Sequence, residues 1–120
     1  MELTVYAYAK CGTCRKALKW LREQGHVLTE IPIVDEPPGA DELEALIDRS
    51  GVDVRKFFNT SGEAYKAMNL KEKLKTMSRD EMIALLASNG RLIKRPIVTD
   101  GRRATVGFDE ETFAQVWSNT

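Results

Sequence analysis

The sequence predicts an α/β fold in which a mixed β-sheet is interrupted by a helical insertion. Runs rich in β-branched and aromatic residues lie near both ends of the chain and are typical of strands. The stretch from about residue 40 to about residue 90 shows helical spacing of its apolar residues instead. A length of 120 residues is that of one compact domain. We therefore expect residues 1–120 to form a single domain that contains the insertion.

The N-terminal segment has the pattern of a strand–helix–strand unit. Residues 3–8 (LTVYAY) are strand-like, and residues 15–24 are rich in helix formers and stop at Gly25. Residues 27–34 supply a second strand, in which Pro32 indicates an edge position or a bulge. A right-handed crossover of this size leaves the two strands parallel.

The insertion carries its own helix signals. Residues 41–49 place leucine and isoleucine at helical spacing. Residues 60–63 (TSGE) and 78–81 (SRDE) both have the sequence of a capping box, which predicts that a helix begins at each. Gly90 is expected to end the helical section.

The C-terminal segment predicts a hairpin followed by a helix. Strand-like residues 97–99 and 104–106 flank Asp100-Gly101, a strong signal for a tight hairpin turn. Residues 109–117 begin with acidic side chains, which suit the N-terminus of a helix. The large aromatic side chains are expected to pack in the core: Trp20, Phe57, Phe58 and Trp117.

Charge and hydropathy argue against several classes of function. The 18 basic and 18 acidic residues give a formal net charge of +0, whereas direct nucleic-acid or membrane-surface binding normally needs a basic excess. No apolar run approaches the ~20 residues of a membrane helix. The N-terminal residues also lack the basic and apolar regions of a signal peptide. We therefore expect a cytoplasmic protein.

The two cysteines form the most informative motif. Cys11 and Cys14 are spaced as Cys-x-x-Cys between a predicted strand and a predicted helix. This spacing lets one helical turn bring two sulfurs within disulfide distance, and a helix N-terminus favours the thiolate. Lys10 and Arg15 are expected to add positive charge. The pattern predicts that Cys11, the more exposed, is the attacking thiolate and that Cys14 is the resolving thiol.

Two other interpretations of the cysteines remain open from the residues alone. Half of a zinc site would need further ligands, and the chain offers only His26 and scattered carboxylates. Two inert free thiols would fit less well between a strand and a helix. His26 itself follows the glycine of a helix-to-strand turn and is expected to be a surface loop residue.

Arg95-Pro96 is the second candidate site, immediately before the hairpin strand. Arg95 could hold an oxyanion or the carboxylate of a bound thiol. The alternatives are a solvated surface arginine and a trans proline at a strand start, where proline removes no ladder hydrogen bond.

Taken together, these residues resemble the ArsC-like (arsenate reductase-related) family, closest to its Spx/YusI/YffB-like subgroup. The resemblance rests on residues 6–21 around Cys-Gly-Thr-Cys, on residues 55–62, and on residues 92–98 leading to 106–108. It implies a thioredoxin-like (glutaredoxin-like) mixed sheet with the helical insertion of the ArsC type. In such folds a proline at the place of Pro96 is commonly cis and faces the cysteine turn.

The resemblance also implies site residues. The arsenate reductases of this family use one nucleophilic cysteine and three arginines, and Cys11 and Arg95 match two of these four. Asn59 and Phe108 lie at or near the places of the other two arginines. Because a charge-assisted hydrogen bond contributes about 1.5–3 kcal/mol, the loss of two should badly weaken arsenate binding. Cys14 further replaces a residue that is usually serine.

We therefore predict a thiol–disulfide oxidoreductase with Cys11, Cys14 and Arg95 as catalytic residues. The residues expected to contact substrate are Lys10, Gly12, Thr13, Arg15 and Pro96. The resemblance implies glutathione, glutaredoxin or thioredoxin as electron donor, with glutathione as a possible co-substrate and no metal or tightly bound cofactor. The alternative is an Spx-like regulator, whose disulfide controls binding to RNA polymerase.

Overall fold

The computed structural model describes residues 1–118 and contains a four-stranded sheet with the strand order β2-β1-β3-β4. The strands are β1 (Glu2–Ala7), β2 (Val27–Pro32), β3 (Ile97–Thr99) and β4 (Ala104–Val106). β1 and β2 are parallel, whereas β3 is antiparallel to both β1 and β4. The predicted mixed sheet is confirmed, including the edge position of the strand that ends at Pro32.

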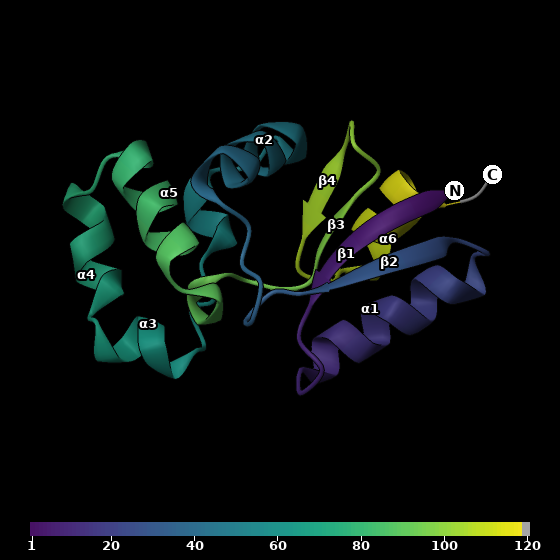
Figure 1. Ribbon diagram of the computed structural model, residues 1–120, viewed down its shortest axis with the longest axis horizontal. Helices are drawn as coiled ribbons and strands as arrows, with labels where there is room; N and C mark the ends of the chain where they lie inside the picture. The colour runs from purple at the N-terminus through teal and green to yellow at the C-terminus, as the bar shows by residue number, and fades with distance from the viewer. Residues whose placement is uncertain (119–120) are drawn as a thin grey trace.

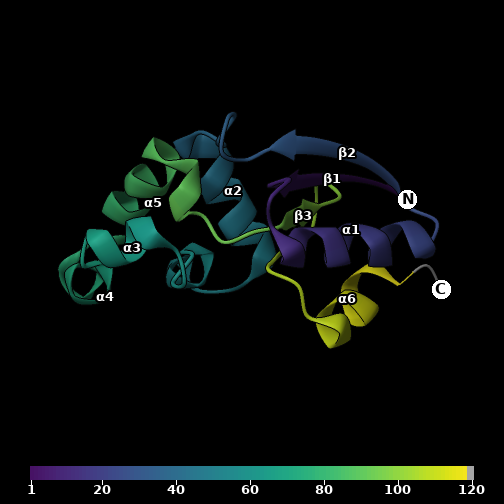
Figure 2. The same cartoon turned by 90° about the horizontal axis from the view of Figure 1, so that it is seen from below.

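Two helices cover one face of this sheet. They are α1 (Gly12–Glu23) and α6 (Glu110–Trp117), which lie together beneath β1 and β3 in Figure 2. Side chains alternate between the faces along β1, as the two-residue period of a strand requires. Leu3 and Val5 are buried with these helices, while Tyr6 is buried with the opposite layer.

The segment between β2 and β3 is helical and lies beside the sheet and over its other face (Figure 1). Its apolar side chains form one cluster with those of the sheet, and Phe57 and Phe58 at its centre are 0% and 1% exposed. The elements are α2 (Ala40–Ser50), η1 (Val54–Phe57), α3 (Glu63–Ala67), α4 (Leu70–Lys73), η2 (Leu74–Thr76), α5 (Arg79–Ser88) and η3 (Gly90–Leu92).

One of the two predicted capping boxes is present. The Glu81 N–H donates to Ser78 Oγ over 3.1 Å, and the Ser78 N–H donates to Glu81 Oε1 over 2.9 Å. The prediction for residues 60–63 is wrong, because the N-cap of α3 is Gly62 and it makes no side-chain cap hydrogen bond. In that turn the Gly62 N–H instead donates to the carbonyl of Asn59 over 3.1 Å.

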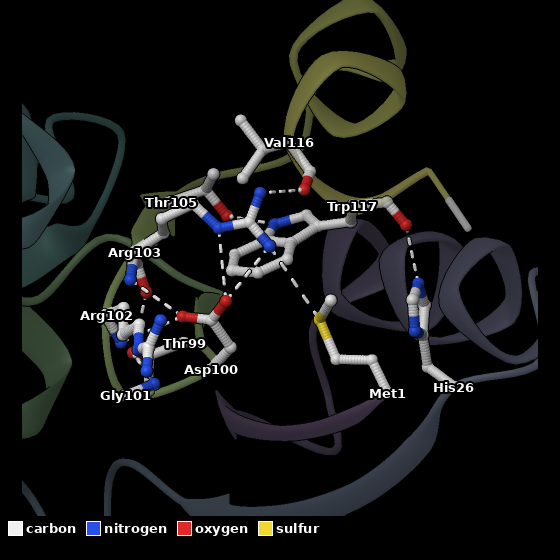
Figure 3. Close-up of polar contacts among 10 residues, drawn as sticks. All are labelled: Met1, His26, Thr99, Asp100, Gly101, Arg102, Arg103, Thr105, Val116 and Trp117. Carbon is white, nitrogen blue, oxygen red and sulfur yellow. Dashed lines mark hydrogen bonds and ion pairs between the residues drawn. The ribbon is translucent and has the colours of Figure 1, made fainter. Parts of the chain in front are cut away.

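His26 is a buried residue and not the surface residue expected from its place in a turn. It is 6% exposed, and its Nε2 donates to the carbonyl of Trp117 over 2.6 Å (Figure 3). The Trp117 indole N–H donates to Thr105 Oγ1 over 3.0 Å, and the Arg103 guanidinium lies 5.1 Å from the indole ring. These contacts hold the end of α6 against the sheet.

Candidate active site

The Cys-x-x-Cys motif lies at the end of the β1–α1 connection and in the first turn of α1. Cys11 is the N-cap of α1, with extended backbone angles, and its sulfur accepts the Cys14 N–H over 3.4 Å. The Cys11 N–H donates to the Tyr8 carbonyl over 3.0 Å, which closes the turn before the helix. Because the first N–H groups of a helix have no partner within it, this sulfur serves as the capping acceptor.

The two thiols occupy different environments. Both cysteines are free; Cys11 is partly exposed, whereas Cys14 is 1% exposed in the apolar cluster between the sheet and α1. Burial, together with the sulfur and charge of Cys11, raises the pKa of Cys14 to about 12, although a backbone contact with Tyr8 opposes the rise. Cys11 is therefore the more exposed of the two, as predicted, while the attacking and resolving roles stay a prediction.

Arg95 is distant from Cys11 in the sequence but lies near it in the fold. The Arg95–Pro96 peptide bond is cis, as the resemblance implied, and the Pro96 carbonyl accepts the Gly107 N–H over 2.9 Å. The half-buried Arg95 guanidinium lies 4.8 Å from the centre of the Tyr8 ring, and it is close enough to Cys11 to influence the pKa of this thiol. Its Nε is buried without a hydrogen-bond partner among residues 1–118.

The pKa of Cys11 is lowered by its contacts, against the effect of burial. Burial raises this pKa, but the Cys14 N–H, the Cys14 thiol and the Arg95 guanidinium together outweigh it. Lys10 and Arg15, which were expected to supply positive charge, are exposed, and neither is a leading cause of this pKa shift. The cation that favours the thiolate is therefore Arg95.

Replacing Arg95 by glutamine is expected to raise the pKa of Cys11, because the positive charge that favours the thiolate is lost. The rate of thiol alkylation rises with pH through the Cys11 pKa and then levels off, so this rise should move to higher pH in Arg95→Gln. Arg15→Gln is the matched control and should leave the profile in place. The pKa is measured by ultraviolet absorbance of the thiolate against pH. An unchanged titration in Arg95→Gln would contradict the assignment.

The other predicted site residues lie near the motif or beside Arg95 in the sequence. Lys10, Thr13 and Arg15 are exposed around the start of α1. Gly12 is the first residue of α1 and has no heavy atom within 4 Å of a Cβ built on it. Pro96, which follows Arg95 in the sequence, is buried. Their contacts with substrate stay a prediction.

A small pocket adjoins this site and contains residues that the motif did not reveal. Its volume is about 180 Å³, and it is bordered by Tyr8, Asn59, Gly62, Glu63, Ala64, Arg91 and Arg95. Asn59 and Arg95 were noted from the sequence as site candidates, whereas Glu63 was noted only as part of a capping box and Arg91 was not noted. Phe108 points to a different role, since its ring packs edge-on against Phe113 with 4.8 Å between centroids.

Residues 1–118 contain no group of three or more His, Cys, Asp or Glu side chains placed to hold a metal ion. None of their helices has the length and apolar character needed to cross a membrane.

Known proteins match this chain over almost its whole length. The profile of the ArsC family matches residues 6–116. The chain is 58% identical to Uncharacterized protein YusI of Bacillus subtilis (strain 168), over 98% of this chain and 100% of that protein. It is 30% identical to the global transcriptional regulator Spx of Enterococcus faecalis, over 91% of this chain and 81% of Spx.

The architecture agrees with the sequence matches. The crystal structure of an ArsC family related protein from Bacteroides fragilis superimposes with a TM-score of 0.92 at 48% identity, over 96% of this chain and 97% of the other. The fold is thus thioredoxin-like with the helical insertion of the ArsC type. The chain belongs to the ArsC family.

Proposed function

We propose that this protein is a thiol–disulfide oxidoreductase whose redox pair is Cys11 and Cys14. The observation that carries the proposal is the asymmetry of the pair. The pKa of Cys11 is lowered at the N-terminus of α1 beside Arg95, whereas that of the buried Cys14 is raised to about 12. One thiol is thus prepared to attack as a thiolate while the other stays protonated.

The proposed reaction begins with attack of the Cys11 thiolate on one sulfur of a disulfide. A Cys11–sulfur bond forms as the substrate's S–S bond breaks, and the second half leaves as a thiolate. The negative charge of Cys11 disappears in this step, and with it one cause of the high pKa of Cys14. Cys14 then loses its proton to water, attacks the Cys11 sulfur and releases the first half as a thiolate. The substrate gains two electrons, and the two cysteines lose them as their disulfide forms.

The oxidised pair must be reduced before another cycle. Glutathione, glutaredoxin or thioredoxin would supply the two electrons, consistent with a protein of the cytoplasm, where such thiols are kept reduced. Arg95 would hold the Cys11 sulfur as a thiolate in each cycle.

A redox-regulated partner protein is the second candidate function. Its support is the 30% identity to the transcriptional regulator Spx over 91% of this chain. In this alternative the same disulfide would change a surface that RNA polymerase recognises, and no substrate would be turned over. Arsenate reduction has weaker support, because Asn59 stands near the place of one expected arginine and Phe108, packed on Phe113, near that of another.

The two functions are separated by steady-state reduction of hydroxyethyl disulfide. Catalytic amounts of the protein are assayed with glutathione and, separately, with a thioredoxin system, and the rate without protein is subtracted. We expect protein-dependent turnover with at least one donor. If the Cys11–Cys14 disulfide forms and is reduced but neither donor sustains turnover, the proposed oxidoreductase function is wrong. Oxidation-dependent co-purification with RNA polymerase would then favour the regulator.

A further inference from the structure

The pocket beside Arg95 contains charges that the proposed reaction does not use. It shares Tyr8 and Arg95 with the cysteine site, since the Tyr8 carbonyl accepts the Cys11 N–H and the Arg95 guanidinium lowers the pKa of Cys11. A molecule that occupies the pocket would therefore contact Arg95, the cation that lowers the pKa of Cys11. At about 180 Å³ the pocket is smaller than the roughly 300–1,000 Å³ of pockets for drug-sized ligands, which suits a fragment the size of one amino acid.

The backbone around this pocket is fixed by hydrogen bonds between two distant segments. The Asn59 N–H donates to the Leu92 carbonyl over 2.8 Å, and the Lys94 N–H donates to the Phe57 carbonyl over 2.7 Å. Between them Phe58 and Ile93 form an isolated antiparallel bridge. The turn that carries Asn59 is thereby attached to the segment that carries Arg91 and Arg95.

Gly62 leaves room for one polar group of the pocket. A Cβ built on Gly62 would lie 2.7 Å from Asn59 Nδ2, so a larger residue there would displace the Asn59 amide. The pocket thus combines a placed amide with the guanidinium groups of Arg91 and Arg95. A carboxylate is the natural partner of such a donor set, because arginine can bind it with two parallel hydrogen bonds.

The pocket also contains one negative charge. Glu63 is exposed in the first turn of α3, and neither its carboxylate nor the Arg91 guanidinium takes part in an ion pair with another residue between 1 and 118. A tetrahedral oxyanion such as arsenate would be repelled by this carboxylate. A group that carries both an ammonium and a carboxylate would instead satisfy both signs of charge.

We propose that this pocket binds the α-amino-acid end of a small disulfide substrate. Arg91, Arg95 and Asn59 would receive the carboxylate, and Glu63 the ammonium group. This inference rests on the proposed oxidoreductase function and names its substrate class. The half of the disulfide held in the pocket becomes bonded to Cys11 while the other half leaves as a thiolate. Cys14 later releases the held half, so that the two cysteines supply both electrons.

Four disulfides test the proposal, because they differ only in their charged ends. Cystine carries both groups, cystamine only the ammonium, 3,3′-dithiodipropionate only the carboxylate, and hydroxyethyl disulfide neither. The reduced protein is mixed with each at low concentration, and the second-order rate constant is divided by that of dithiothreitol with the same disulfide. This division removes differences in intrinsic reactivity. We expect cystine to react about tenfold faster than hydroxyethyl disulfide on this scale, as one well-made charged contact would give.

Two variants then assign the charges. Arg91→Gln should reduce the ratio of the cystine rate to the hydroxyethyl disulfide rate severalfold, whereas the control Arg102→Gln, on the exposed β3–β4 turn, should leave that ratio unchanged. In Glu63→Gln the normalised rate constants for cystine and 3,3′-dithiodipropionate should become similar, because the partner of the ammonium group is lost. Equal normalised rates for all four disulfides with the parent protein would overturn the inference and leave the oxidoreductase standing. No reaction with any of them would overturn the proposed function itself.

Discussion

Replacing Cys11 by serine is expected to reduce disulfide exchange to the rate of the uncatalysed reaction. A serine hydroxyl remains protonated near neutral pH and cannot take the place of the thiolate that Arg95 and the Cys14 N–H favour. The Cys11 side chain is only partly buried at the N-cap of α1, and serine is itself a good N-cap residue. The variant should therefore fold like the parent, which circular dichroism and thermal unfolding would show.

The matching change at the second cysteine should give a different result. Cys14→Ser is expected to stop the reaction after the first step and leave the substrate half bonded to Cys11, visible as an added mass of the intact protein. Because Cys14 is 1% exposed and a buried hydroxyl can lose its partners at a cost of about 1–3 kcal/mol, Cys14→Ala serves as a second variant with an apolar replacement. Full turnover without a trapped adduct in both variants would contradict the resolving role of Cys14.

Much of the fold follows from patterns that are local in the sequence. The β1–α1–β2 unit, the turn at Asp100-Gly101 and the capping box at Ser78 each depend on residues within one or two elements. The Cys-x-x-Cys motif is local in the same sense. The start of α1 determines the positions of both cysteines, because Cys11 is the N-cap and Cys14 lies in the first turn. Cys14 is buried because it lies on the apolar face of α1.

The errors share a physical cause, which is that contacts distant in the sequence leave no periodic pattern. His26 is buried because of the Trp117 carbonyl, 91 residues away. The cation among the leading causes of the lowered Cys11 pKa is Arg95, which is distant in the sequence, whereas the neighbouring Arg15 is exposed. Arg91 reaches the candidate site only because an isolated bridge joins two segments of the insertion.

Gly90→Ala is expected to destabilise the fold. Gly90 begins η3, and a Cβ built on it would lie 2.1 Å from the Ile33 carbonyl oxygen and 3.0 Å from Val34 Cα. Both are backbone atoms, so no side chain can rotate to make room. Since forced overpacking costs about 1–3 kcal/mol, we expect a loss of that size in the free energy of unfolding, measured in urea.

Gly12→Ala is the matched control for this change in stability. No heavy atom lies within 4 Å of a Cβ built on Gly12, and alanine is the better helix former at the start of α1. Its unfolding free energy should equal or slightly exceed that of the parent. If Gly90→Ala unfolds at the same urea concentration as Gly12→Ala, η3 does not lie fixed against the end of β2. Because η3 carries Arg91 and leads to Arg95, a shift there should also slow disulfide exchange, which ties the position of the two arginines to a glycine far from either cysteine in the sequence.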